Sequence, residues 1–145
     1  MTRTAFRKIL SANDVGLTGG HQAGVLIPKG NTDLLGFLPP LDGGIKNPDA
    51  WINCVDDDGV MHRFRFVYYN NKLHDERGTR NEYRVTYMTA WFRNQNAKPG
   101  DAFEISRNRG NSDYHIRIIR AETEATPCPE GGAIRLRLKG WQRVH

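Results

Sequence analysis

The feature that most constrains this chain is an alternation of apolar and polar residues with a period of two. Between Arg63 and Tyr69, the aromatic residues Phe64, Phe66 and Tyr68 share one face. Successive side chains of a strand point to opposite faces, so this pattern predicts strands with one buried and one wet face. The strand candidates are Thr4 to Leu10, Ala23 to Pro28, Ala50 to Val55, Arg63 to Tyr69, Tyr83 to Arg93, Ala102 to Arg107, Tyr114 to Ile118 and Ile134 to Leu138.

Turn sequences separate these runs. The run Asp56-Asp57-Asp58-Gly59 lies between two strand candidates and is typical of a hairpin turn. The stretch from Asn108 to Ser112 predicts a second turn. A short helix is expected over Thr32 to Leu38, capped by Asn31 or Thr32. Short strands with frequent turns predict a mainly β barrel or sandwich with one or two short helices.

Length and charge narrow the function. The chain has 145 residues, which favours a single domain over residues 1–145, and its net charge of +5 suggests an anionic partner, with nucleic acid the first candidate. No run approaches the roughly 18 apolar residues of a membrane helix, and the N-terminus lacks the apolar block of a secretion signal. Cys54 and Cys128 either form a single bridge or are free buried thiols, and we expect the latter.

Common catalytic signatures are absent from the sequence. It has no phosphate-binding P-loop, no Gly-x-Ser-x-Gly motif, no paired histidines at metal-ligand spacing, and no Asp-x-Lys or Glu-x-Lys. The acidic run Asp56 to Asp58 could bind a cation, but its position favours a solvated hairpin turn.

Two polar segments suggest recognition. Leu10 to Gln22 contains Gly16, Gly19 and Gly20, and glycine lets backbone amides approach a ligand closely. An ordinary flexible loop is the alternative interpretation of that segment.

The second segment runs from Tyr69 to Arg84 and contains Arg80, Glu82 and Arg84 at a spacing of two. On a strand these three side chains share one face. Arginine matches the major-groove acceptors of guanine, and glutamate can accept from the cytosine amino group. A surface salt-bridge ladder is the alternative.

At these segments the chain resembles a known family. Ser11 to Pro28 reads S-A-N-D-V-G-L-T-G-G-H-Q-A-G-V-L-I-P, and Tyr68 to Arg84 contains Y-Y-N and T-R-N-E-Y-R. Both blocks resemble the N-terminal effector domain of EcoRII-type restriction endonucleases. Lys98 to Phe103 and the hairpin ending at Ile118 resemble the last part of the DNA-binding pseudobarrel shared with plant transcription factors.

The resemblance implies a seven-stranded, open DNA-binding pseudobarrel with two arms. Ser11 to Gln22 would be the N-terminal arm and Lys72 to Arg84 the C-terminal arm, both entering the major groove of a short pseudopalindromic site of the CCWGG type. By matching position, the first DNA-contact candidates are Lys8, His21, Arg80, Glu82 and Arg84. Further candidates are Ser11, Asn13, Asp14, Thr18, Gly19, Gly20, Gln22, Asn70, Lys72, Arg77, Thr79 and Asn81. Candidates for phosphate contacts are Lys72, Lys98, Arg107 and Arg109.

The expected function is therefore sequence-specific binding of double-stranded DNA by the regulatory domain of a prokaryotic, cytoplasmic type II restriction endonuclease. Catalysis, and the Mg²⁺ it needs, would belong to a nuclease domain C-terminal to this chain. The domain itself is expected to be a monomer without cofactor, metal, membrane contact or catalytic residues. Three alternatives remain: a transcription-factor domain without a nuclease, a small metal-dependent nuclease using Asp56 to Asp58, and an RNA- or carbohydrate-binding barrel. A-form RNA hides its major groove from side chains, which disfavours RNA.

Overall fold

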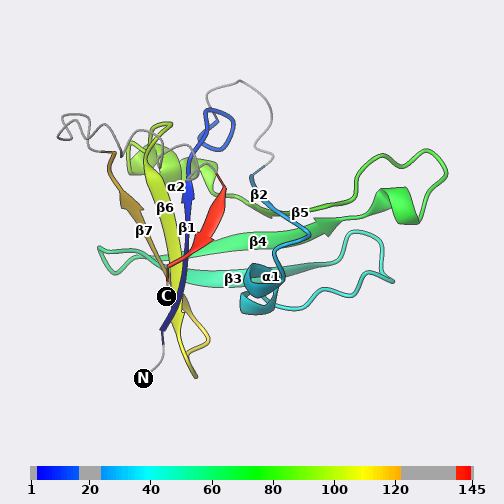
Figure 1. Ribbon diagram of the computed structural model, residues 1–145, viewed down its shortest axis with the longest axis horizontal. Helices are drawn as coiled ribbons and strands as arrows, with labels where there is room; N and C mark the ends of the chain where they lie inside the picture. The colour runs from blue at the N-terminus through cyan, green and yellow to red at the C-terminus, as the bar shows by residue number, and fades with distance from the viewer. Residues whose placement is uncertain (1–2, 17–23, 122–139, 145) are drawn as a thin grey trace, which may run out of the picture.

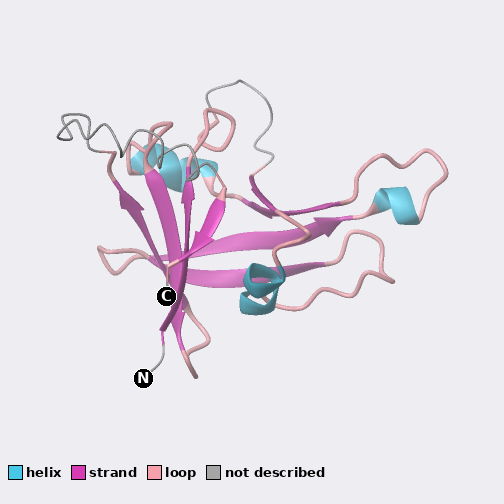
Figure 2. Cartoon of the chain, in the orientation of Figure 1, coloured by secondary structure: helices cyan, strands magenta, loops and turns pink. Residues whose placement is uncertain are grey.

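The computed structural model describes residues 3–16, 24–121 and 140–144, and strands dominate it (Figure 2). Eight strands form one sheet in the order β2-β5-β4-β3-β7-β6-β1-β8. The strands are β1 (Arg3–Ile9), β2 (Val25–Ile27), β3 (Asp49–Val55), β4 (Met61–Tyr69), β5 (Glu82–Thr86), β6 (Ala102–Asn108), β7 (Tyr114–Ile119) and β8 (Trp141–Arg143). The helices are α1 (Thr32–Phe37), α2 (Thr89–Asn94) and the 3-10 turn η1 (Asn71–Leu73).

The sheet consists of two halves that cross (Figure 1). One half is β2-β5-β4-β3 and the other is β7-β6-β1-β8, and neighbouring strands within each half are antiparallel. The halves are joined by a short parallel pairing of β3 and β7, in which Cys54 and Val55 face Tyr114 and His115.

The two edge strands of the sheet approach each other. The indole nitrogen of Trp141 in β8 donates a hydrogen bond of 2.9 Å to the carbonyl oxygen of Leu26 in β2. Among the described residues, a side-chain hydrogen bond connects β8 to β2, and no backbone hydrogen bonds pair these two strands. The curled sheet is therefore an open barrel. The predicted mainly β pseudobarrel is confirmed, with eight strands among the described residues in place of the expected seven.

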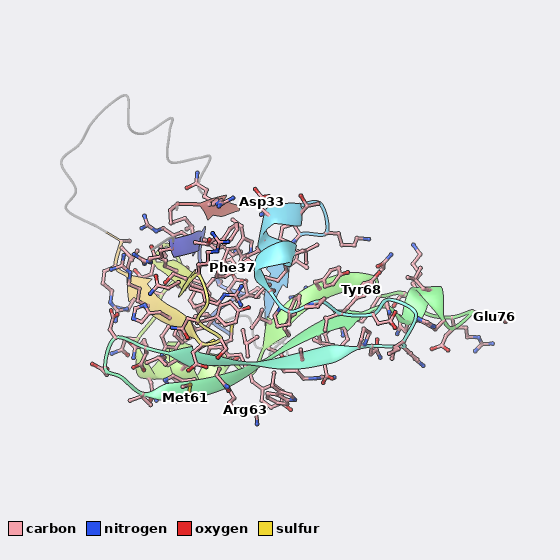
Figure 3. The ribbon with its side chains drawn as sticks, turned by 90° about the horizontal axis from the view of Figure 1, so that it is seen from below. Asp33, Phe37, Met61, Arg63, Tyr68 and Glu76 are labelled. Carbon is pink, nitrogen blue, oxygen red and sulfur yellow. The ribbon has the colours of Figure 1, made fainter. Side chains whose placement is uncertain are left out.

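The core fills the inside of this curl. Phe64 and Phe66 of β4 are buried, as the period of two predicted, and Arg63 points away from the core on the opposite side of the ribbon from Phe37 (Figure 3). Phe37 of α1 packs on Phe6, with ring centroids 5.1 Å apart. Large aromatic side chains contribute most of the apolar burial in such a core.

The helix expected at Thr32 to Leu38 is confirmed as α1. The Asn31 side chain caps it by accepting a hydrogen bond from the Leu34 amide at 3.1 Å. An Asn at this position satisfies a backbone N–H group that the helix leaves without a partner.

The single strand predicted over Tyr83 to Arg93 is wrong. β5 ends at Thr86, Tyr87 adopts a positive φ of 74°, and α2 begins at Thr89. Trp91 and Phe92 are adjacent and both buried, which helical geometry allows and a strand with one wet face does not. The strand predicted at Ile134 to Leu138 lies outside the described residues.

The Asp56 turn is a hairpin turn, as predicted, but Asp56 is not solvated. Its side chain is 6% exposed and accepts hydrogen bonds from the backbone amides of Asp58 and Val60. It also contacts His62 Nε2 at 2.8 Å and accepts from the indole of Trp91 at 3.3 Å. Desolvation by burial raises the pKa of Asp56, but these hydrogen bonds outweigh it and lower the pKa below its usual value.

Within the described part of the chain, no helix is long and apolar enough to cross a membrane. Cys54 is a free, fully buried thiol at the β3–β7 junction, and Cys128 lies outside the described residues. Burial, with a smaller contribution from the charge of Asp113, raises the pKa of Cys54 to about 12.

Cys54 is therefore expected to be inert in the folded protein, because thiolates rather than thiols react. In a Cys128→Ser variant, a thiol reagent such as DTNB should label no cysteine in native buffer at pH 8 and one cysteine after denaturation. Labelling in native buffer at the rate of the denatured chain would contradict the burial of this thiol.

Candidate nucleic-acid interface

The C-terminal arm projects from the ends of β4 and β5 (Figure 1), with Glu76 near its tip (Figure 3). Its base is closed by a backbone hydrogen bond of 3.0 Å from the Lys72 amide to the Arg80 carbonyl. The Asn71 side chain adds a second link of 2.8 Å by accepting from the Arg80 amide. Lys72, Arg77 and Thr79 are exposed along this loop.

Asn70 fixes the loop from the inside. It is fully buried, its Nδ2 group donates to the carbonyl oxygens of Gly43 and Ile45, and its Oδ1 accepts from the Asn47 amide at 2.7 Å. Asn70 therefore has a structural role, and the DNA contact predicted for it is unsupported because its side chain does not reach the surface.

Gly78 lies where the loop passes closest to η1. A Cβ atom built on it would lie 2.1 Å from the Asn71 carbonyl oxygen, far inside van der Waals contact. Only glycine fits this crossing, because a side chain would force the two backbone segments apart.

The predicted row of Arg80, Glu82 and Arg84 lies at the junction of the arm and β5. The Glu82 carboxylate binds both arginines, with Arg80 Nη2 at 2.9 Å and Arg84 Nε in closer contact. Partial burial raises the pKa of Glu82, but the hydrogen bonds and positive charges of Arg84 and Arg80 outweigh this and lower the pKa below its usual value. Glu82 is thus a carboxylate that holds two guanidinium groups in one row.

Tyr69 contacts the row, and Tyr68 and Tyr83 stack on the other face of β4 and β5. The Arg80 guanidinium lies 3.8 Å from the ring centroid of Tyr69, a cation–π contact that the sequence did not predict. Tyr68 stacks on Tyr83 at 4.2 Å and donates a hydrogen bond of 2.6 Å to the Asn81 side chain. Arg80 is therefore oriented by Tyr69 as well as by Glu82, and its side chain is still 39% exposed.

The base of the N-terminal arm is held by a buried ion pair. The ammonium group of Lys8 contacts the Asp14 carboxylate at 2.5 Å, and the two side chains are only 12% and 7% exposed. Asp14 also accepts from the Ser11 amide, and the Ser11 hydroxyl accepts from the Asp14 amide. Asp14 thus binds both Lys8 and Ser11, which gives the three residues a structural role at the start of the arm, while Asn13 is exposed.

The C-terminal arm also contacts the segment that follows the N-terminal arm. Arg84 Nη1 donates a hydrogen bond of 3.2 Å to the carbonyl oxygen of Gly24, the first described residue after the N-terminal arm. Gly24 has a φ of 81°, and a Cβ on it would lie 2.2 Å from the Val85 carbonyl oxygen. The remaining predicted contacts of this arm, Thr18, Gly19, Gly20, His21 and Gln22, lie outside the described residues.

The predicted phosphate contacts fall into two groups. Lys72 lies on the C-terminal arm, and Lys98 lies in the loop whose Gly100 and Asp101 bond the backbone of Leu10. Arg107 and Arg109 lie elsewhere, since Arg107 pairs with Thr4 at the start of β1 and the N-terminal arm follows the end of β1.

Within residues 3–16, 24–121 and 140–144, no cluster of three or more His, Cys, Asp and Glu side chains could hold a metal ion. Asp56 is bonded within its own hairpin and to Trp91, and Asp57 contacts His115 at 2.9 Å. The geometry of this acidic turn therefore gives the alternative of a metal-dependent nuclease no support.

Replacing Gly78 with alanine should destabilise the C-terminal arm by about 1–3 kcal/mol, because the new methyl group meets the Asn71 backbone. Hydrogen exchange at the Lys72 amide should accelerate. Gly36→Ala is the matched control, since a Cβ there meets no atom within 4 Å and alanine favours the α1 helix. Equal exchange at Lys72 in both variants would contradict the close crossing.

Comparisons with known proteins agree with the fold. The chain is 37% identical over 87 residues to the type II restriction enzyme EcoRII of Escherichia coli, an alignment that covers 54% of this chain and 19% of that enzyme. The chain thus spans about a fifth of the length of that relative. The structure is also similar to that of FUS3 from Arabidopsis, solved in a complex with DNA. Here the TM-score is 0.62 at 21% identity, covering 82% of this chain and 99% of the chain in that structure, and this likeness shows the fold alone.

The match to a known family is broader. Residues 2–100 match the family described as "Restriction endonuclease EcoRII, N-terminal". This range includes the sequence of both arms and the strands that carry them. The chain belongs to the EcoRII N-terminal domain family of restriction endonucleases.

Proposed function

We propose that this chain is a sequence-specific double-stranded DNA-binding domain, and that it is the regulatory domain of a type II restriction endonuclease. The observation that carries the proposal is the row of Arg80, Glu82 and Arg84, held at the root of a projecting arm in a chain of this family. The DNA complex of the similar FUS3 fold supports nucleic acid as the ligand class.

The row suits the edges of G·C base pairs. Arginine presents a planar pair of donors to the O6 and N7 acceptors of guanine, and a carboxylate accepts from the N4 amino group of cytosine. Because Glu82 holds both arginines, the donors and the acceptor are in place before DNA arrives. We infer that the arms enter the major groove of a short pseudopalindromic site of the CCWGG type, with the N-terminal arm reading the other part of the site.

Catalysis and regulation would involve the rest of the parent enzyme. The aligned relative is about five times longer than the region it shares with this chain, which leaves room for a C-terminal nuclease domain and its Mg²⁺. Binding of one copy of the site by this domain would regulate cleavage of another copy. A transcription-factor domain without a nuclease is the alternative, and the sequence of the parent gene beyond this chain separates the two.

Arg80→Ala and Glu82→Ala should each weaken binding to a CCWGG duplex by about 1–3 kcal/mol and relax base specificity. Gel-shift titration against the CCWGG duplex and a scrambled duplex measures both effects. Arg93→Ala is the control, because it removes one charge from the exposed end of α2. If Arg80→Ala lowers affinity equally for both duplexes, Arg80 contacts the backbone and does not read bases.

Lys72→Ala should behave differently from Arg80→Ala. Lys72 is exposed on the arm and is proposed to contact a phosphate, so its loss should weaken binding to all duplexes alike. The slope of log K against log salt should become less steep by about one, the value expected for one lost phosphate contact. An unchanged slope would exclude a phosphate contact by Lys72.

A further inference from the structure

A cluster of arginines lies on the outer face of the sheet, away from both arms. Arg7 of β1, Glu104 of β6 and Arg117 of β7 are direct cross-strand neighbours. The Glu104 carboxylate is only 1% exposed and binds Arg3 at 2.9 Å, Arg7 at 2.8 Å and Arg117 at 3.0 Å. Three guanidinium groups thus surround one buried carboxylate.

Three arginines around one glutamate leave a net positive charge on this outer face of the sheet. Burial raises the pKa of Glu104, but the hydrogen bonds and charges of Arg7 and Arg117 outweigh it and lower the pKa below its usual value, so the group carries one full negative charge at neutral pH. One negative charge against three positive charges leaves an excess of two. The arginine side chains are 37–40% exposed, so solvent or a ligand can reach them.

An open cavity of about 510 Å³ adjoins the cluster. Arg3, Arg107, Arg117 and His115 line it, together with Asn108 and Asn111. Among the described lining residues, Asp113 is the acidic one, and its amide donates to Asn111 Oδ1 at 3.1 Å. His115 also contacts Asp57 at 2.9 Å on the exposed side.

The arginines keep donors for a ligand. Arg117 binds Glu104 through Nε, and Arg3 binds Glu104 and Ser106 through Nη2. Arg107 differs from these two arginines, because its guanidinium lies over the core rings of Phe37 and Tyr114, 5.5 and 4.9 Å from their centroids, and is not counted among the donors. Each guanidinium has five N–H donors, and a planar fork of donors matches the oxygens of a phosphate group.

We propose that this cavity, formed by Arg3, Arg117 and the β6–β7 turn, is a second anion site that binds a phosphate group. It lies near the start of β1, whereas the N-terminal arm follows the end of β1 and the C-terminal arm extends from β4 and β5 (Figure 1). The site therefore does not depend on base reading by the arms. The phosphate belongs either to the backbone of a DNA segment other than the one at the arms or to a small phosphate-bearing molecule.

The test is an NMR titration of the protein with inorganic phosphate at constant ionic strength, with sodium chloride as the matched series. Resonances of Arg3, Arg117 and residues 106–115 should shift and saturate with phosphate alone. Asn111→Asp adds a negative charge to the cavity yet keeps the oxygen that accepts from the Asp113 amide, and it should weaken phosphate binding about tenfold. Arg117→Gln should have a similar effect, and Arg93→Gln on α2 should have none.

Shifts that follow ionic strength in both series, or equal affinity in Asn111→Asp and the wild-type chain, would overturn the proposal. A thermal melt of Asn111→Asp verifies that the hairpin is intact. The source of the phosphate is resolved by adding a short duplex without a CCWGG site. Movement of the same resonances, reversed by phosphate, assigns the site to a DNA backbone, and saturation by phosphate but not by the duplex assigns it to a small molecule.

Discussion

The parallel pairing of β3 with β7 is the junction on which the arrangement of the molecule depends. It involves only Cys54 and Val55 on one strand and Tyr114 and His115 on the other, yet it joins the two halves of the sheet. The N-terminal arm leaves one half after β1 and enters the other at β2, and the C-terminal arm extends from the second of these halves. The Tyr114 hydroxyl donates a hydrogen bond to the Phe37 carbonyl oxygen, which ties this junction to α1. This junction therefore helps to position the arms, together with the Arg84–Gly24 contact and the Trp141–Leu26 bond.

Much of the fold follows from the period of two. A strand that buries one face alternates apolar and polar residues along its own sequence. Phe64 and Phe66 in β4 and Ile116 in β7 lie in the core as that pattern requires. The helix α2 leaves no such pattern: it is six residues long and its N-cap, Met88, makes no side-chain capping bond. Its position is decided by the packing of Trp91 and Phe92 against Phe103, a contact between distant parts of the chain. Local sequence does not encode that choice.

The candidate site was predictable in its residue types and less so in their roles. Spacing alone placed Arg80, Glu82 and Arg84 on one face, and the structure shows that Glu82 also binds both arginines. The sequence alone leaves base recognition and a salt-bridge ladder as alternatives, and the structure shows the ion pairs of such a ladder, which are compatible with the proposed base recognition. By contrast, Asn70 and Lys8 look like polar surface residues in the sequence, and their burial depends on loops that come from elsewhere in the fold. A single sequence does not show which residues distant along the chain will contact each other.

The stacking of Arg80 on Tyr69 has a thermodynamic consequence. A free arginine side chain loses up to about 2 kcal/mol of rotamer entropy when it is fixed in a complex. Here the ring of Tyr69 and the carboxylate of Glu82 already restrict Arg80 in the unbound protein, so folding has supplied part of that ordering. A matching ligand therefore binds an Arg80 side chain that is already ordered. A mismatched ligand meets the same ordered side chain, which has little freedom to adapt to it. Preorganisation of this kind favours discrimination between ligands over tolerance of them.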